Sequence, residues 1–282
     1  MPSFRHEGRR IAYQSYGPTD GEPTLVLVHG LLMNRLMYAA LAPEIASRGN
    51  RVVTIDLLGH GESERPDDLR EYSMGRFADQ VKGLIDHLEL DRPVVGGTSL
   101  GANVGLELGA RHPDSARALF IEMPVLDNAL LAIGAIFVPV MFGLRFGRPF
   151  LAGVSRVTSR LPRSHYLVDI GLDWIRQRPE PSLAVLQGLM FGRIAPPREE
   201  RSKIELPALV IGHPRDPLHP FSDSDCLVEE MPNARLLDAN SILEWRLRPR
   251  RLNDELAAFV ADSYAKPNRS RKVTKASKRA AV

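Results

Sequence analysis

One serine of this chain stands in a setting where it could act as a nucleophile. Ser99 lies at the centre of GTSLG (97–101), with two valines before it and an apolar, helix-like run after it. A strand that turns sharply into a helix exposes such a serine, and the turn tolerates only small residues two positions away on either side. We therefore expect Ser99 to be presented for attack on a carbonyl carbon. A serine hydroxyl is a poor nucleophile without an adjacent base, so the chain must also supply that base.

A second stretch, LVLVHGLL (25–32), indicates where the negative charge of a tetrahedral intermediate would be held. Gly30 follows an apolar run and permits a sharp turn, which would aim the amide of Leu31 at an oxyanion. The amide of Leu100, at the start of the helix after Ser99, would be the second donor. We expect the His29 side chain to have a structural role, bonded to local backbone.

The elements that must position these residues alternate between strands and helices. Six short apolar runs are typical of buried strands: 24–30, 51–56, 92–97, 117–122, 207–212 and 234–239. Amphipathic helical patterns separate them. This alternation predicts a mostly parallel, doubly wound α/β sheet with helices on both sides. In such sheets ligands bind beyond the carboxyl ends of the strands. Five polar residues lie at or just past predicted strand ends: His29, Asp56, Ser99, Glu122 and Asp216.

One stretch interrupts this alternation. From about residue 125 to 199 there is no clear strand pattern, and apolar segments are broken by Pro, Gly and Arg. We interpret it as an inserted helical lid. The predicted organisation is a first core part (1–124), the lid (125–202), a second core part (203–264) and a basic disordered tail (265–282).

DLLGHGESERP (56–66) completes a set of three motifs. HG at 29–30, D-x-x-G-H-G-x-S at 56–63 and G-x-S-x-G at 97–101 together resemble the α/β-hydrolase superfamily, in its lid-bearing branch of esterases, peroxidase-like enzymes and C–C hydrolases. The resemblance covers roughly 10–125 and 203–262. It implies a nucleophile at Ser99, an oxyanion hole at Leu31 and Leu100, and an acid after a late strand. It also implies a structural role for His60.

The acid that the resemblance implies falls in LVIGHPRDPLHP (209–220). Asp216 and Pro220 match a Gly-x-x-Asp-x-x-x-Pro pattern, in which His213 stands where glycine is common. A solvent-facing turn aspartate before Pro217 is the alternative interpretation of Asp216. Glu122 is a second candidate acid, because some relatives carry theirs after that strand.

The chain departs from the family pattern at the base. The resemblance implies a histidine about seven residues before the proline that leads into the last helix, but Ile242 occupies that position and no histidine follows His219. His219, three residues past Asp216, could be a surrogate base, and His213 is another candidate. No histidine base at all is the third alternative. Glu244 is a weaker candidate near the vacant position, and a base must in any case lie within hydrogen-bond reach.

Bulk composition agrees with a soluble globular protein of 282 residues, 44% hydrophobic and 25% charged. Cys226 is the only cysteine, which excludes an intrachain disulfide and favours a reducing, cytoplasmic setting. The most apolar stretch, 129–144, is shorter than the roughly 20 residues of a spanning helix. We therefore expect that the chain is not an integral membrane protein. We expect neither a cofactor nor a metal.

The end of the chain is strongly basic. After Ala265 it carries seven Lys/Arg and no acid. Because the formal net charge of the whole chain is +3, the residues before this tail have a net charge of −4. We expect a solvated, disordered end; the alternative is a weak contact with anionic surfaces. The absence of aromatic residues in the tail argues against specific nucleic-acid binding.

These features predict a serine hydrolase that cleaves a carboxylic ester, thioester or related acyl bond of a lipophilic small molecule. Apolar residues of the predicted lid motivate the lipophilic substrate: Phe137, Met141, Phe142, Phe146 and Met190. The resemblance argues against dehalogenase or epoxide-hydrolase chemistry, because those relatives carry an aspartate at the position of Ser99. The alternative is a catalytically weak or inactive protein of the same fold that binds a small apolar ligand.

Overall fold

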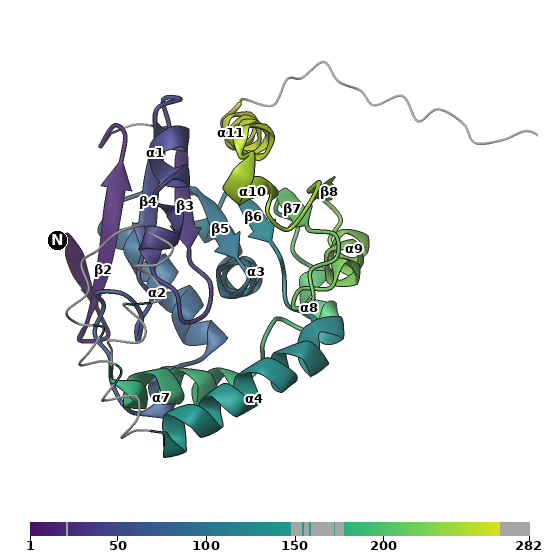
Figure 1. Cartoon of the computed structure of the whole chain (residues 1–282). Coiled ribbons are helices and arrows are strands. Elements are labelled where there is room, and N and C mark those ends of the chain that lie inside the picture. The colour runs from purple at the N-terminus through teal and green to yellow at the C-terminus, as the bar shows by residue number, and fades with distance from the viewer. Residues whose placement is uncertain (21, 148–153, 155–157, 159–171, 173–177, 266–282) are drawn as a thin grey trace, which may run out of the picture.

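The structure, a computed structural model, describes residues 1–20, 22–147, 154, 158, 172 and 178–265. Eight strands form one sheet in the order β1-β2-β4-β3-β5-β6-β7-β8 (Figure 1). Their bounds are β1 Ser3–His6, β2 Arg9–Tyr16, β3 Thr24–Val28, β4 Arg51–Ile55, β5 Val94–Thr98, β6 Ala118–Glu122, β7 Ala208–Gly212 and β8 Ala234–Asp238. The pairs β1–β2 and β2–β4 are antiparallel and the other pairs are parallel. The predicted mostly parallel α/β sheet is confirmed.

Helices cover both faces of the sheet. One face packs against α2 (Met74–His87), α3 (Leu100–Arg111) and α9 (Phe221–Glu230), and the other against α1 (Leu41–Ala46) and α11 (Arg250–Tyr264). Within β3, Val26 and Val28 join the first core, while Leu25 and Leu27 join the second. Side chains alternate between the faces of a strand, so a strand covered on both sides must be apolar throughout. This is why the central strands appear in the sequence as continuous apolar runs.

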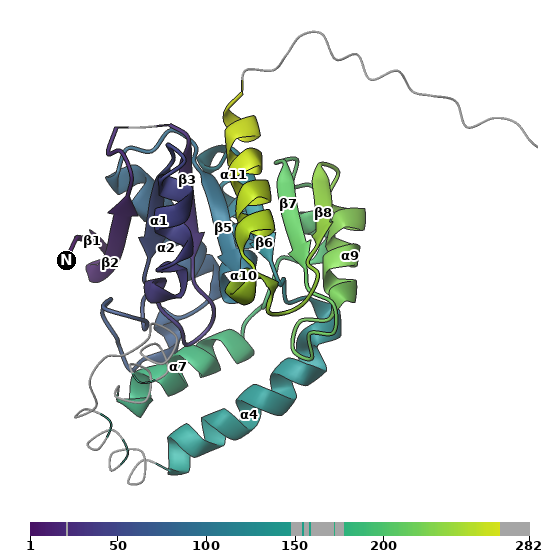
Figure 2. The ribbon, with the colours of Figure 1, turned by 45° about the horizontal axis from the view of Figure 1, so that its top comes forward.

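The chain leaves the sheet after β6 and returns at β7. The described helices of this insertion are α4 (Leu130–Phe146), α7 (Pro179–Met190) and the short α8 (Arg198–Arg201), with a 3₁₀ turn at Asp127–Ala129 before α4. Helices α4 and α7 pack together and lie across one end of the sheet (Figures 1 and 2). His165 of the predicted lid and residues 266–282 of the predicted tail lie outside the described residues.

Helix α4 and its preceding turn form a stretch of 20 residues, Asp127–Phe146, with a mean hydropathy of 2.1. It is the one helix in the described part of the chain that is long and apolar enough to cross a membrane, and 17% of its most apolar window is buried. The helical stretch is thus longer than the apolar run in the sequence indicates. One helix of this kind is weak evidence for a membrane protein.

Candidate active site

Ser99 occupies the sharp turn between β5 and α3. Its backbone has φ 56° and ψ −110°, a conformation that costs a side-chain-bearing residue about 1–3 kcal/mol. A Cβ atom at either Gly97 or Gly101 would lie 1.9 Å from the carbonyl oxygen of Val28. The end of β3 therefore excludes side chains at both flanking positions, which explains the two glycines of the motif. Glu122 fixes the turn from the other side, because its carbonyl oxygen accepts from the Ser99 N–H at 2.9 Å.

His219 and Asp216 complete a chain of hydrogen bonds that begins at Ser99. His219 Nε2 lies 2.9 Å from Ser99 Oγ, and His219 Nδ1 lies 3.0 Å from Asp216 Oδ2. An ionised carboxylate can only accept, so Nδ1 carries the hydrogen and Nε2 is free to accept the Ser99 proton. The three side chains have the connectivity of a nucleophile, its base and an orienting acid.

The loop after β7 is folded by Asp216 itself. Asp216 Oδ1 accepts from the backbone N–H groups of Leu218 and His219, at 2.8 and 3.0 Å, as aspartates do in tight turns. Burial raises the pKa of Asp216, but the hydrogen bonds from the His219 ring and from these two N–H groups outweigh it and lower the pKa to about 2. Asp216 is thus an anion at every ordinary pH, and it is not the solvent-facing turn residue of the alternative interpretation.

Two backbone N–H groups beside Ser99 are available to an incoming oxyanion. Leu100 is the first residue of α3, where N–H groups have no partner within the helix. Leu31 follows Gly30 at the end of β3 and precedes Leu32, whose φ of 58° marks a sharp turn. Within the described residues neither N–H group has a hydrogen-bond acceptor, and both residues line a cavity that reaches Ser99. This arrangement suits an oxyanion hole.

His213 and Glu122, the other candidates for base and acid, pair with each other. His213 Nε2 lies 3.0 Å from Glu122 Oε1, and its Nδ1 lies 3.1 Å from the carbonyl oxygen of Ser241. Burial lowers the pKa of His213, but the hydrogen bond to Glu122 and its charge outweigh this effect and raise the pKa overall. Glu122 Oε2 accepts from Thr98 Oγ1. Both residues are therefore engaged with one another and with the turn before Ser99, rather than with its hydroxyl.

Glu244 is also held by other groups. Its carboxylate accepts from Arg251 Nε at 2.7 Å and from the backbone N–H of Asn240. The hydrogen bond from Arg251 lowers the pKa of Glu244 to about 2, although burial opposes the shift. The Glu244 carboxylate is therefore charged and paired with Arg251, so it anchors the segment after β8 and is a poor general base.

The remaining polar residues near strand ends form hydrogen bonds with backbone groups. His29 Nδ1 donates to the carbonyl oxygen of Gly30 at 2.8 Å, and its Nε2 accepts from the N–H of Leu57 at 3.2 Å, in the structural role expected. His60 Nδ1 donates to the carbonyl oxygen of Leu58 at 3.0 Å. Asp56 is buried against the Arg35 guanidinium. These contacts tie the ends of β3 and β4 together.

The apolar residues of the predicted lid lie in different surroundings, and Met141 packs against the cluster of Leu144, Leu183 and Leu186. Phe137 and Met190 line the cavity beside Ser99. Phe142 and Phe146 instead stack on each other with ring centroids 5.9 Å apart, and they are 61% and 71% exposed. Of the five apolar residues that motivated a lipophilic substrate, Phe137 and Met190 therefore border the serine, whereas Phe142 and Phe146 do not. Helix α4 presents one face to the site and the other to solvent, which the uniformly apolar sequence does not reveal.

Several residues at the site carried no signal in the sequence. Asn103 is buried on α3, and its side-chain amide accepts from the N–H of Val125 and donates to the carbonyl oxygens of Val125 and Ile194. Val125 and Ile194 lie near the two ends of the insertion. Ile242 and Trp245, from the loop where the base was expected, line a second cavity at Ser99. The described residues contain no group of three His, Cys, Asp or Glu that could hold a metal ion.

Comparison with known proteins identifies the family of this fold. The family model described as the alpha/beta hydrolase fold matches residues 23–150. The 2-hydroxymuconate semialdehyde hydrolase of Pseudomonas putida is 30% identical over 207 residues, covering 68% of this chain and 69% of that protein. The chain belongs to the α/β-hydrolase superfamily. The expectation drawn from the three motifs is confirmed, and the similar curated proteins are hydrolytic enzymes of this superfamily.

Two other members of the superfamily show how far the similarity extends. A haloalkane dehalogenase of Mycolicibacterium paratuberculosis is 32% identical over 120 residues, or 43% of this chain, and the chain spans about two fifths of the length of this and a second such dehalogenase. The crystal structure of an enol-lactonase from Burkholderia xenovorans superposes with a TM-score of 0.73 over 92% of this chain and all of that chain, at 24% identity. At that identity the structural likeness shows the fold alone.

Proposed function

We propose that this chain is a serine hydrolase that cleaves a carboxylic ester, thioester or related acyl bond of a small lipophilic molecule. The observation that carries the proposal is the contact of His219 Nε2 with Ser99 Oγ at 2.9 Å, on a ring whose other nitrogen binds Asp216. A protein that only binds an apolar ligand needs neither a base on the serine nor two free N–H groups beside it. The contact therefore favours the enzyme over the ligand-binding alternative.

The mechanism follows from these positions. Ser99 Oγ attacks the carbonyl carbon while its proton passes to His219 Nε2, and Asp216 stabilises the imidazolium that forms. The N–H groups of Leu31 and Leu100 donate to the oxyanion of the tetrahedral intermediate. His219 then protonates the leaving alkoxide or thiolate, which departs and leaves the acyl group on Ser99. A water molecule, deprotonated by His219, releases the carboxylic acid and restores the serine.

The apolar surroundings support a lipophilic substrate. The cavity bounded by Leu31 and Leu100 is otherwise lined mostly by apolar side chains of α4, α7 and their flanks, among them Ile133, Leu186 and Met190. In this proposal α4 and α7 form the lid of the site. The serine at position 99 distinguishes the chemistry from that of dehalogenases, whose nucleophile is an aspartate.

The proposed setting is the cytoplasm, with a small molecule as the partner and without a cofactor. The single cysteine, Cys226, supports a reducing compartment. The proposal includes neither a membrane-spanning role nor specific nucleic-acid binding. Weak contact of the basic tail with anionic surfaces is the remaining proposed interaction.

A fluorophosphonate probe tests the function directly. The intact mass of the wild-type protein should increase by one adduct, the adduct should map to Ser99, and Ser99→Ala should abolish it. His219→Ala should slow labelling by about 10²- to 10⁴-fold, the usual contribution of a general base. His213→Ala is the matched control, since His213 contacts Glu122 and Ser241 instead of Ser99. Absence of Ser99-dependent labelling from pH 5 to 9 would refute the hydrolase, and equal labelling of the two histidine variants would refute the role of His219.

A further inference from the structure

Ser99 lies between two cavities of different size. The first, of about 50 Å³, is bounded by Leu100, Asn103, Ile133 and Leu186. The second, of about 290 Å³, is bounded by Thr98, His219, Ile242 and Trp245. Leu31, Phe137 and Ser99 line both cavities. An ester bound at Ser99 has two arms, the acyl group and the alcohol group, so each arm has one cavity available to it.

The positions of His219 and Leu100 decide which arm enters which cavity. His219 must hand its proton to the oxygen of the departing alcohol, so that oxygen lies on the side of the imidazole ring. His219 lines only the larger cavity. Leu100, which offers an N–H group to the carbonyl oxygen, lines only the smaller one. The alcohol therefore extends into the larger cavity and the acyl chain into the smaller.

The volumes then define the substrate class. A water molecule needs about 10–15 Å³ of such space, so the smaller cavity has room for a few heavy atoms and the larger for a bulkier group. We propose that the site is specific for esters of short acyl chains with bulky apolar alcohols. This inference rests on the proposed hydrolase function, and it adds which arm of the substrate is large.

The loop after β8 creates the larger cavity. Ile242 stands where the family resemblance implies the base, and because His219 supplies that base from the loop after β7, the space beside Ile242 is left to substrate. Trp245 closes the far side. Its indole Nε1–H donates to Asn253 Oδ1 at 2.7 Å, and its ring meets Phe120 edge-on at 5.7 Å between centroids. These contacts fix the wall and so set the length of the alcohol that fits.

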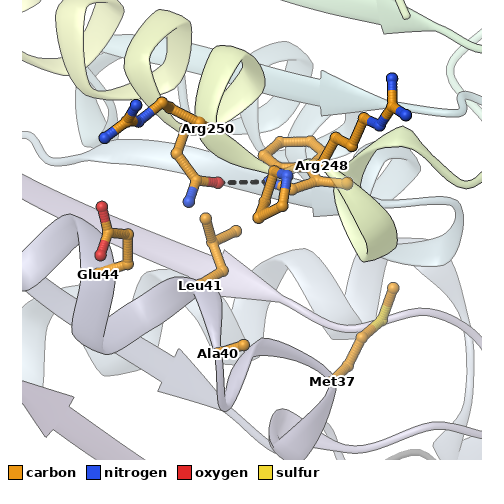
Figure 3. Close-up of a pocket in the computed structure, with 9 residues that line it drawn as sticks. Met37, Ala40, Leu41, Glu44, Arg248 and Arg250 are labelled. Carbon is orange, nitrogen blue, oxygen red and sulfur yellow. Dashed lines mark hydrogen bonds between the residues drawn. The ribbon is translucent and has the colours of Figure 1, made fainter. Parts of the chain in front are cut away.

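A third cavity lies on the other side of Trp245 and Met37. Trp245 and Met37, which both line the larger cavity, also line a separate cavity of about 410 Å³ between α1 and the α10–α11 junction (Figure 3), where α10 spans Glu244–Leu247. The guanidinium groups of Arg248 and Arg250 at its rim point away from each other, so they form no common anion site (Figure 3). The indole and the Met37 side chain are thus the partition that limits the alcohol cavity.

The test is a matrix of esters on the full chain. Along the acyl series 2-naphthyl acetate, butyrate and octanoate, kcat/KM should fall at least tenfold from acetate to octanoate. Ethanol and 3-phenylpropanol are primary alcohols of similar acidity. The kcat/KM for 3-phenylpropyl acetate should exceed that for ethyl acetate at least tenfold. A preference for octanoate, or for the ethyl ester, overturns the assignment.

Two variants and a control locate the preference. Ile133→Ala should raise the octanoate-to-acetate ratio of kcat/KM at least tenfold, because it lengthens the acyl cavity. Ile242→Trp should lower the phenylpropyl-to-ethyl ratio at least tenfold by filling the alcohol cavity. Leu243→Trp, the adjacent exposed position that lines neither cavity, should leave both ratios unchanged. If Ile133→Ala alters the alcohol ratio and Ile242→Trp alters the acyl ratio, the two arms are reversed.

The inference and the function fail in different ways. Hydrolysis that disappears in Ser99→Ala but favours long acyl chains would overturn only the cavity assignment. Hydrolysis of no ester in the matrix, or equal hydrolysis by wild type and Ser99→Ala, would overturn the proposed function and the assignment with it.

Discussion

At the scale of single residues, the site depends on one hydrogen position. Asp216 can only accept, so it keeps the hydrogen of His219 on Nδ1 and leaves Nε2 to accept from Ser99. The sequence predicted Ser99 from the glycines around it, because steric demands at a sharp turn are local. It left the base open between His219, His213 and none. Which ring reaches Ser99 depends on the path of the loop after β7, and residue spacing does not specify that path.

The substitution Asp216→Asn tests this hydrogen position. The carbonyl oxygen of the introduced amide can still accept from the N–H groups of Leu218 and His219, so the turn should persist. The NH₂ group of that amide would donate to His219 Nδ1, which moves the ring hydrogen to Nε2 and removes the acceptor from Ser99. We expect kcat for ester hydrolysis to fall on the order of 10⁴-fold, as in other triads that lose this carboxylate, with an unchanged far-UV circular dichroism spectrum. Loss of less than tenfold would show that Asp216 does not orient the base.

At the scale of elements, strands β3 to β8 were predictable and the edge strand β1 was not. The six apolar runs overlap β3 to β8, and β3 to β7 are buried at nearly every position, since strands covered on both faces must be apolar throughout. The short edge strand β1 (SFRH) has mixed polar and apolar residues and only one buried side chain, Phe4, so no pattern marks it. The loop after β8 also escaped prediction. Its function as a cavity wall depends on Ile242 and Trp245 lining the same cavity as Met37 and Thr98, which are remote in sequence.

The anchor of that loop is predicted to depend on pH. Glu244, paired with Arg251, has a pKa of about 2, below the usual value near 4.3 of an unfolded glutamate. A lowered pKa stabilises the fold above the unfolded value, and the contribution is lost as the pH falls towards 2. Glu244→Gln should therefore lower the free energy of unfolding by about 1–3 kcal/mol at pH 7, and by less at pH 3. Urea unfolding at the two pH values measures both differences.

Glu229→Gln is the control for this prediction. Glu229 is an exposed carboxylate on α9 with no ion pair within the described residues. Its substitution should change the free energy of unfolding by less than about 0.5 kcal/mol at both pH values. An equal loss for Glu244→Gln at pH 7 and pH 3 would contradict an ionic anchor.

At the scale of the whole molecule, charge is unevenly divided between residues 1–265 and the basic residues 266–282. The seven Lys/Arg after Ala265 leave the remainder with a net charge of −4. Basic segments gain about 1 kcal/mol per residue near an anionic membrane surface. The proposed weak contact of the tail with anionic surfaces predicts that the full chain floats with vesicles containing 30% phosphatidylserine at low salt, and that a chain truncated after Tyr264 stays in solution; without the contact, both stay in solution. Neutral vesicles and 0.5 M salt should abolish flotation.

The truncated chain distinguishes binding through the tail from binding through the exposed apolar face of α4. Leu131, Phe142 and Phe146 are exposed on that helix. If the truncated chain floats as well as the full chain, and salt does not release it, the contact is apolar and does not arise from the tail.

The spacing of Asp216 and His219 has a consequence for how the site assembles. The two residues are three positions apart, whereas Ser99 and His219 are 120 apart. The entropic cost of bringing residues together grows with the length of chain between them. The acid and the base therefore meet as soon as one short turn forms, and a single long-range closure, the docking of β7 beside β6, the neighbour of β5, delivers both to the serine. A triad spread over three loops needs two such closures. In this chain the orientation of the base thus depends on contacts within one short turn and needs no second long-range closure.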